Sequence, residues 1–338
     1  MNRRNFLKTG LSGFAAGCAY WGTTGLSLTH SARVHAAPIS FDITALASLK
    51  AVESSVDPVT GLPSSRNVHV WEFVDLAGGG PGALKAGLKV FQGDTVTLNF
   101  TNSLTTHSLR IHIPGIDTRS WPSVGPGLTV SYQFVADKIG SFLICDRENG
   151  LLGQAMGLAM PMVVYPTDGG SRLVSEISPQ YSYISEYTLL LHEIDSRIND
   201  AVEAGLPYNL SQYNPDYFFV NGLSYPDTVY DAAGLMDENK LLLLPLNEQV
   251  AIRFINGGLI YYPMHFHGYH TNVVLRNQTR ETHVIEKDTV VLRPSETVDS
   301  ILPVGSQSGL YPMHTHYVPG VTTAGKYAGG ALLMMKAV

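Results

Sequence analysis

Two short segments in the second half of the chain have the residue types and spacing of a metal site. Residues 262–267 read Tyr-Pro-Met-His-Phe-His, and residues 311–316 read Tyr-Pro-Met-His-Thr-His. On a β-strand, residues two apart point to the same face about 6.6–6.8 Å apart, so each histidine pair can lean onto one metal ion or straddle two. If the two strands are neighbours, all four imidazoles converge. The pattern therefore predicts one metal centre whose ligands are His265, His267, His314 and His316.

The ligand type narrows the choice of metal only partly. Imidazole suits copper, zinc, iron or nickel, and a set without thiolate forms a borderline-soft site. A single His-x-His pair would fit an exposed or hydrogen-bonded strand pair equally well, but the second copy in the same context favours ligands. Met264 and Met313 point to the opposite face of each strand. They are expected in the hydrophobic core rather than on the metal.

The first half of the chain carries a reduced version of this pattern. Counted from the glycine that begins each strand, residues 314–316 correspond to residues 145–147, which read Cys-Asp-Arg. Residues 265–267 fall near residues 110–112, where His112 is the histidine that remains. The first half is therefore expected to add at most His112 to the metal centre.

Other polar residues have less specific interpretations. Arg110 occupies the position of a lost ligand, where its permanent charge disfavours a nearby metal and could hold an anionic substrate. Asp146 and Glu148 could deliver protons or could simply be solvated loop charges. The isolated histidines are expected to be ordinary surface or hydrogen-bonded residues: His69, His192, His270 and His283.

The amino-acid composition excludes several classes of protein. The 338 residues are 44% hydrophobic and only 15% charged, which is typical of a globular chain and excludes a disordered one. The length suggests two domains. Two cysteines cannot form a disulfide scaffold or a cysteine-rich zinc module. The formal net charge of −6 leaves no basic surface of the kind that binds nucleic acid.

The elements that would position these residues are short strands. In residues 95–100, Val96, Leu98 and Phe100 alternate with polar residues, and residues 249–254 alternate in the same way. Such strands, separated by glycine, proline and asparagine, predict an all-β sandwich or barrel. One helix is expected between strands, running from Ser196 as its N-cap towards Gly205.

The chain also repeats itself. Residues 93–102 align with 247–256, and residues 126–130 align with 294–298. Residues 166–171, rich in glycine and turn-forming residues, have the composition of a linker. Two copies of one β domain are the simplest account, with domain 1 at residues 37–170 and domain 2 at residues 171–338.

Residues 1–36 are interpreted as a targeting segment rather than as part of the fold. Arg3 and Arg4 precede Phe-Leu-Lys and then a glycine- and alanine-rich apolar stretch to about Leu28. This segment resembles a twin-arginine export signal, which carries folded proteins across the bacterial inner membrane. A membrane anchor and a lipoprotein cleavage at Cys18 are weaker alternatives, because the interrupted apolar run is shorter than the roughly 20 residues that span a bilayer.

Cleavage after Ala36 would change the composition. It would remove four basic residues and no acid, and it would leave ten of the twelve histidines and one cysteine, Cys145. No intramolecular disulfide would then be possible. The mature chain is expected to be acidic, periplasmic and without stable insertion in the membrane.

These residues together resemble a known family. The mature chain is similar to two-domain multicopper oxidases and copper nitrite reductases, which are built from paired cupredoxin domains. Residues 256–268 resemble the third histidine motif of multicopper oxidases, residues 309–316 the fourth, and residues 217–222 the Asn-Gly strand that precedes them. His107 and His112 have the spacing of a nitrite reductase segment whose first histidine binds type 1 copper and whose second binds type 2. The resemblance implies an all-β fold of two tandem cupredoxin-like Greek-key β-sandwich domains, with copper as the cofactor.

The chain departs from the family where electrons would enter. A multicopper oxidase has cysteine between the two histidines of its fourth motif, where this chain has Thr315. The partner histidine three residues before His265 is replaced by Tyr262. In domain 1 the resemblance assigns Cys145 to the type 1 thiolate position, but the histidine expected about nine residues later is Gln154. Cys145 fits equally well as a small buried hydrophobe.

The resemblance implies an exported copper-binding oxidoreductase with a histidine-only cluster. It would reduce oxygen or a small oxyanion with electrons from an external donor. The alternative is a non-catalytic cupredoxin scaffold or copper carrier that has lost its electron-entry site. In the family the cluster lies between domain 1 of one subunit and domain 2 of the next, so a homotrimer is expected in which His112 meets the four histidines of domain 2.

Overall fold

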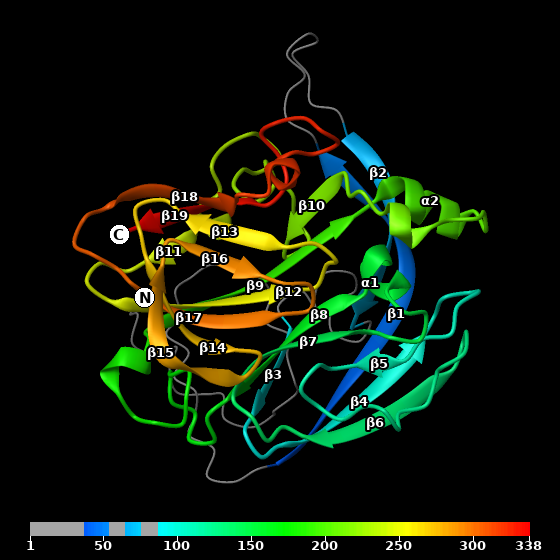
Figure 1. Ribbon diagram of the computed structural model, residues 1–338, viewed down its shortest axis with the longest axis horizontal. Helices are drawn as coiled ribbons and strands as arrows, with labels where there is room; N and C mark the ends of the chain where they lie inside the picture. Colours follow the sequence, from blue (N-terminus) through cyan, green and yellow to red (C-terminus); the bar gives the residue numbers. More distant parts are fainter. Residues whose placement is uncertain (1–36, 54–64, 76–86) are drawn as a thin grey trace, which may run out of the picture.

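Strands dominate the structure, as the alternating patterns predicted (Figure 1). The computed structural model describes residues 37–53, 65–75 and 87–338, so the predicted export signal lies outside the described residues. The first half contributes β1 (Pro38–Glu53), β2 (Ser65–Val74), β3 (Leu88–Phe91), β4 (Thr95–Asn102), β5 (Ile111–His112), β6 (Thr129–Val135), β7 (Gly140–Asp146) and β8 (Ala159–Tyr165). The second half contributes β9 (Ser185–Ile194), β10 (Tyr217–Val220), β11 (Leu242–Leu244), β12 (Gln249–Asn256), β13 (Tyr262–Phe266), β14 (Thr271–Arg276), β15 (Thr279–Lys287), β16 (Thr289–Leu292), β17 (Thr297–Pro303), β18 (Gly309–Thr315) and β19 (Leu332–Ala337).

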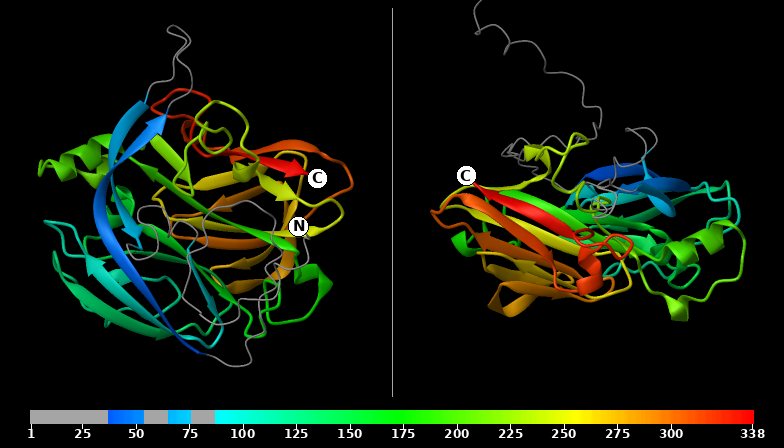
Figure 2. Two further views of the ribbon diagram at one scale, coloured as in Figure 1. Left: turned by 180° about the vertical axis from the view of Figure 1, so that it is seen from behind. Right: turned by 90° about the horizontal axis from the view of Figure 1, so that it is seen from above.

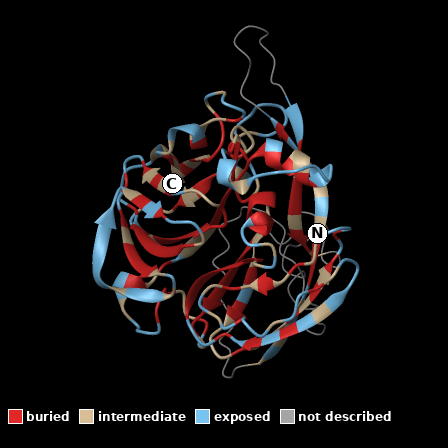
Figure 3. Ribbon diagram, turned by 45° about the vertical axis from the view of Figure 1, so that its right-hand side comes forward, coloured by how far each residue is buried: buried red, intermediate tan, exposed pale blue. Residues whose placement is uncertain are grey.

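The strands form four sheets, two in each half of the chain. The first half has the strand orders β2-β1-β4-β6 and β3-β8-β7-β5, and the second half has β10-β9-β12-β17-β14-β15 and β11-β19-β18-β13-β16. Each half has its own buried hydrophobic cluster, and the two halves lie side by side (Figure 2). The buried residues concentrate inside both halves (Figure 3).

Strand pairing repeats between the halves in the order that the sequence repeat predicted. β4 pairs with β1 in parallel and with β6 antiparallel, and β12 pairs with β9 in parallel and with β17 antiparallel. In the facing sheets, β7 lies between β5 and β8, just as β18 lies between β13 and β19. The chain therefore contains two copies of one β-sandwich.

The helices of the described residues are short. α1 (Leu152–Met156) and α2 (Ser196–Glu203) are α-helices, and the 3-10 turns are η2 (Pro179–Tyr181), η3 (Leu210–Gln212), η4 (Glu238–Lys240) and η5 (Val318–Val321). α2 begins one residue earlier than predicted, because Asp195 rather than Ser196 is the N-cap and its carboxylate accepts the Arg197 backbone N–H. Among the described residues, no helix is long and apolar enough to cross a membrane.

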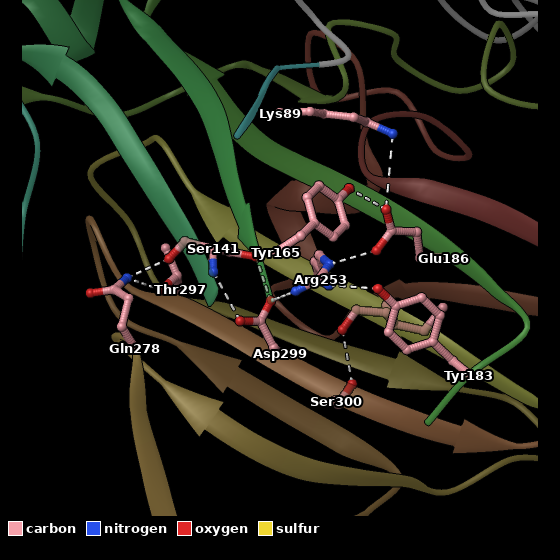
Figure 4. A network of polar contacts seen from close by, with 11 residues as sticks. Lys89, Ser141, Tyr165, Tyr183, Glu186, Arg253, Gln278, Thr297, Asp299 and Ser300 are labelled. Atoms are coloured by element: carbon pink, nitrogen blue, oxygen red, sulfur yellow. Dashed lines mark hydrogen bonds and ion pairs between the residues drawn. The ribbon is translucent and has the colours of Figure 1, made fainter. Parts of the chain in front are cut away.

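A buried arginine joins the two halves. Arg253 of β12 is fully buried; its Nε donates to Glu186 Oε2 at 2.9 Å, and its Nη1 donates to Asp299 Oδ1 at 3.2 Å (Figure 4). From the first half, the Ser141 backbone N–H donates to Asp299 Oδ2 at 2.9 Å, and the Tyr165 hydroxyl donates to Glu186. Although burial alone would raise the pKa of Glu186, the charge of Arg253 holds it below its usual value.

Candidate metal centre

Two neighbouring strands carry the four histidines of the second half. β13 and β18 are antiparallel, and His265 lies directly opposite His314. Because side chains alternate along a strand, His267 and His316, which immediately follow the two strand ends, fall on the same face. Met264 and Met313 lie on the opposite face, where both are fully buried in the core of the second half. The methionines are therefore core residues, as predicted.

The four imidazoles gather on this outer face. The His265 ring centroid lies 4.9 Å from that of His267, 5.9 Å from that of His314 and 4.4 Å from that of His316. The His314 centroid lies 5.1 Å from His267 and 5.4 Å from His316. The structure thus brings together four of the five residues that the sequence nominated as ligands.

Hydrogen bonds orient two of these rings. His265 Nδ1 lies 3.0 Å from Thr289 Oγ1 and 3.2 Å from the Asp288 carbonyl oxygen, and His314 Nδ1 lies 3.0 Å from the Thr315 carbonyl oxygen. A carbonyl oxygen can only accept, so these Nδ1 atoms carry the proton. The Nε2 atoms of both rings are then unprotonated. His265 Nε2 can bind a metal directly, whereas His314 Nε2 accepts a hydrogen bond from His267 Nε2 that a metal ion would replace.

Electrostatics favours the neutral rings that a metal needs. Burial lowers the pKa of His267, and the neighbouring His314, His265 and His316 lower it further. The pKa of His316 is lowered by burial and then by His265 and His314. Each ring therefore resists protonation because its neighbours would repel a second positive charge. Metal binding requires deprotonated imidazole, so the lowered pKa values of His267 and His316 favour the form of these two rings that can bind a metal.

The donor chemistry fits a histidine-bound metal ion. His267 Nε2 and His314 Nε2 lie 3.0 Å apart, the separation of two adjacent ligands whose metal–nitrogen bonds are about 2.0 Å. In the described ranges, no group of three potential ligands is already arranged around one point. Small rotations of the half-exposed and exposed rings would be needed to converge a third or fourth nitrogen.

His112 lies apart from the cluster within one chain. It ends β5, and its Nδ1 lies 2.9 Å from Thr118 Oγ1. It lines an open pocket that also contains Arg110, Arg119 and Arg147. Burial lowers the pKa of His112, and Arg147 and Arg110 lower it further. The same positive charge would weaken the binding of a metal cation by this ring alone.

The strand register corrects the sequence alignment of the two halves. His112 lies opposite Cys145, as His265 lies opposite His314. His112 is thus equivalent to His265 rather than to His267, and Arg110 does not occupy the position of a lost ligand. Cys145 is taken as the equivalent of His314, as the spacing predicts, because each is the sixth residue of a seven-residue strand that begins at a glycine.

The same register shows that Cys145 is not at the thiolate position. The residue of domain 1 equivalent to Thr315 is Asp146, one position further along the strand. Cys145 is fully buried among Leu143, Leu190 and Ile255, on the face of β7 that packs against the second half. Burial raises the pKa of its thiol to about 12. Cys145 is the small buried hydrophobe that the sequence offered as the alternative.

Most of the remaining polar candidates are held by structural contacts outside the cluster. The His107 ring packs against Trp71 with a centroid separation of 5.0 Å. Asp146 is buried, and its Oδ1 accepts the backbone N–H groups of Arg110 and Glu148. His69 contacts Asp200, His192 contacts the Gln154 carbonyl, and His270 and His283 are exposed.

Thr289 and Asp288 were missed by sequence reasoning. Thr289 begins β16, the strand that pairs with β13, and Asp288 immediately precedes it. Their contacts with His265 depend on that pairing, and neither residue carries a local motif. The sequence alignment identified Arg147 only as the residue that replaces a histidine. The pairing of His112 with Cys145 places Arg147 opposite Arg110.

Comparisons with known families agree with the sequence motifs. Two family models, both described as multicopper oxidase, match residues 81–169 and 209–322, which together make up more than half of the chain. L-ascorbate oxidase of Cucumis sativus is 29% identical over 145 residues, which are 38% of this chain and 23% of that protein. The chain thus aligns with about a quarter of the length of this curated relative.

Solved structures share the fold. Blue copper oxidase from Nitrosomonas europaea matches with a TM-score of 0.69 and 22% identity, over 89% of this chain and 86% of that chain. Copper nitrite reductase from Nitrosomonas europaea matches with a TM-score of 0.62 and 18% identity, over 89% of this chain and 94% of that chain. These matches confirm the predicted fold class of two tandem cupredoxin-like β-sandwiches.

Proposed function

Because the chain belongs to the multicopper oxidase superfamily, we propose that it is an exported copper-dependent oxidoreductase with a histidine-only copper cluster. Copper is the cofactor that this family implies. The protein would reduce oxygen or a small oxyanion with electrons from an external donor. The observation that carries the proposal is the gathering of four imidazoles on one face of β13 and β18.

The chain's own residues would prepare this site for copper. His265 and His314 are held by oxygen acceptors at Nδ1, so their Nε2 atoms are oriented before copper arrives. The exposed His267 and His316 would rotate towards a shared ion, and His267 would give up its hydrogen bond with His314. When bound, copper would supply one-electron chemistry and a Lewis-acidic position for an oxygen-containing substrate.

We further propose that the active form is a homotrimer in which His112 of one subunit reaches the cluster of the next. The family resemblance supports this arrangement, and within one chain the His112 ring contacts Thr118 rather than the four histidines of domain 2. Export by the twin-arginine route to the periplasm is supported by Arg3 and Arg4. Replacing both with lysine should leave the protein in the cytoplasm. Light scattering of the purified protein tests the trimer, and a monomeric mass would contradict it.

The alternative function is a non-catalytic cupredoxin scaffold or copper carrier. It is favoured by the loss of the electron-entry site in both halves. The type 1 thiolate is replaced by Thr315 in domain 2, and the equivalent position in domain 1 is Asp146. An enzyme without this site would have to accept electrons directly at the histidine cluster.

Metal analysis and electron paramagnetic resonance of the exported protein test the copper site. We expect His265→Ala and His314→Ala to lose copper, because each removes one of two opposed ligands. His283→Ala is the matched control, since His283 is an exposed histidine outside the cluster. Copper below one equivalent per three chains, unchanged by both cluster substitutions, would refute the proposed site.

Turnover distinguishes the enzyme from the carrier. Oxygen or nitrite consumption is measured with artificial electron donors on the copper-loaded protein. Consumption that disappears in His265→Ala and persists in His283→Ala supports the enzyme. Copper binding without consumption of either acceptor supports the scaffold or carrier.

A further inference from the structure

The pocket around His112 is strongly basic. It has a volume of about 290 Å³ and is lined by Arg110, Ile111, His112, Thr118, Arg119 and Arg147. Three of these six residues are arginines and none is a carboxylate. This concentration contrasts with the formal net charge of −6 of the whole chain.

Two of the arginines face each other across paired strands. Ile111 lies opposite Asp146, so Arg110 and Arg147 occupy the next opposed position. The Arg147 backbone N–H donates to the Arg110 carbonyl oxygen at 3.1 Å, which fixes this register. Like charges directly opposite each other destabilise a pair of strands. An anion held between the two guanidinium groups would remove this repulsion.

The nearby carboxylates neutralise this charge only in part. Arg110 Nε lies 3.3 Å from Glu148 Oε2, and both side chains are partly exposed. Arg119 donates to both oxygens of Asp117 at 2.9 and 2.8 Å, at the exposed rim. Arg147 forms no ion pair with any described residue, and its side chain contacts the uncharged Cys145 thiol. At least one guanidinium therefore remains for a ligand.

We propose that this pocket binds a small oxyanion of the carboxylate or phosphate class, held by Arg147 and Arg110. A planar guanidinium donates two parallel hydrogen bonds to two oxygens of such an anion. The volume lies at the lower end for ligand pockets, which favours a small ligand. His112 also lines this pocket, so in the proposed trimer the oxyanion would lie beside the histidine cluster of the next subunit. The inference therefore rests on the proposed function and deepens it, although binding itself needs neither copper nor turnover.

Calorimetric titration of inorganic phosphate into the metal-free full-length protein tests the proposal. The buffer has low ionic strength, and acetate, citrate and chloride are titrated in parallel to separate phosphate from carboxylate and from simple charge screening. We expect saturable binding of phosphate or a carboxylate, weakened about tenfold or more in Arg147→Gln, because charge-assisted hydrogen bonds are lost. Arg147→Lys keeps the positive charge but loses the two parallel N–H donors of the guanidinium. It should therefore bind the oxyanion more tightly than Arg147→Gln but less tightly than the unchanged protein.

A variant that binds the oxyanion more tightly is a useful further test, because misfolding can lower the affinity but does not raise it. Glu148→Gln removes the carboxylate that competes for Arg110 and should tighten oxyanion binding about two- to fivefold, the range expected for a partly exposed ion pair. Arg280→Gln is the matched control, because Arg280 is a partly exposed arginine of β15 paired with Glu176. It should leave oxyanion affinity unchanged.

The copper proposal and the oxyanion proposal fail separately. His265→Ala should lose copper and keep oxyanion binding, whereas Arg147→Gln should keep the copper of β13 and β18. The oxyanion proposal is overturned by any of three results: no saturable binding, equal binding of chloride, or equal affinity in Arg147→Gln and the unchanged protein.

Discussion

Replacing Arg253 with methionine should separate the energetic role of the buried network from side-chain packing. Methionine fills most of the arginine volume, so the change removes the charge without opening a large cavity. Two carboxylates then lose their shared cation. Glu186 keeps the Tyr165 hydroxyl and a Lys89 ammonium 3.9 Å away, and Asp299 keeps its contacts with Ser141.

The expected cost follows from burial. The Arg253 side chain is 0% exposed, and its partners Glu186 and Asp299 are 13% and 1% exposed. Removing one partner of such a buried pair leaves uncompensated charge in a poorly polarisable interior, which costs about 3–5 kcal/mol. The network also joins strands of both halves, so the lost free energy should weaken docking of the two sandwiches. We expect Arg253→Met to lower the free energy of unfolding by about 3–5 kcal/mol.

Urea unfolding followed by circular dichroism measures this loss. Arg280→Met is the matched control, because Arg280 Nη1 also lies 2.9 Å from a carboxylate oxygen, that of Glu176, but both side chains are about half exposed. It should cost less than about 1 kcal/mol. A loss in Arg253→Met no larger than in the control would refute the reasoning.

A multiple variant checks the cause. Arg253→Met combined with Glu186→Gln and Asp299→Asn removes the cation together with both anions. It should recover much of the stability, because no buried charge is left unpaired. If the triple variant is less stable than Arg253→Met alone, the cost comes from lost packing or hydrogen bonds instead.

Three further predictions concern individual side chains. The copper-loaded protein should lack an intense blue absorption band, because the buried Cys145 thiol resists ionisation; an intense band that vanishes in Cys145→Ser would contradict this. Met264→Leu and Met313→Leu should keep full copper content by metal analysis and cost less than about 1.5 kcal/mol in urea unfolding, because both methionines are core residues. Burial lowers the pKa of His192 to about 4, so the folded state keeps this ring neutral. Between about pH 6.5 and about pH 4 the unfolded chain binds a proton at His192 and the folded chain does not, so the free energy of unfolding should fall by up to about 3 kcal/mol over this range. Unfolding measured at several pH values should show no such loss in His192→Gln.

The sequence predicted the architecture because alternation and repetition are local properties. The buried face of β4, with Val96, Leu98 and Phe100, follows directly from period-two spacing. The same reasoning identified the face of β12 that packs in the core, but it did not predict that the opposite face is buried as well. Ala251, Arg253 and Ile255 are buried there against other parts of the molecule, and no local pattern reveals such contacts.

The candidate site shows the same limit. The four histidines of domain 2 could be grouped from their spacing, because pairing two similar strand ends brings them together. The strand partner of His112 could not be predicted, since a shift of two residues in register keeps a side chain on the same face but changes the residue opposite it. The basic pocket was equally hidden, because it depends on Arg110 and Arg147 being paired across two strands.

The pairing of β13 with β18 has a consequence for how the proposed metal site forms during folding. His267 and His314 are 47 residues apart in sequence, so an unfolded chain offers two separate pairs of imidazoles and never the complete set. Copper bound by all four would therefore favour the native state over the unfolded one. At a free copper concentration one hundred times its dissociation constant, this linkage would add about 2.7 kcal/mol to stability. Copper uptake would then report the completion of the second sandwich, and a chain exported in folded form would cross the membrane with its binding site already assembled.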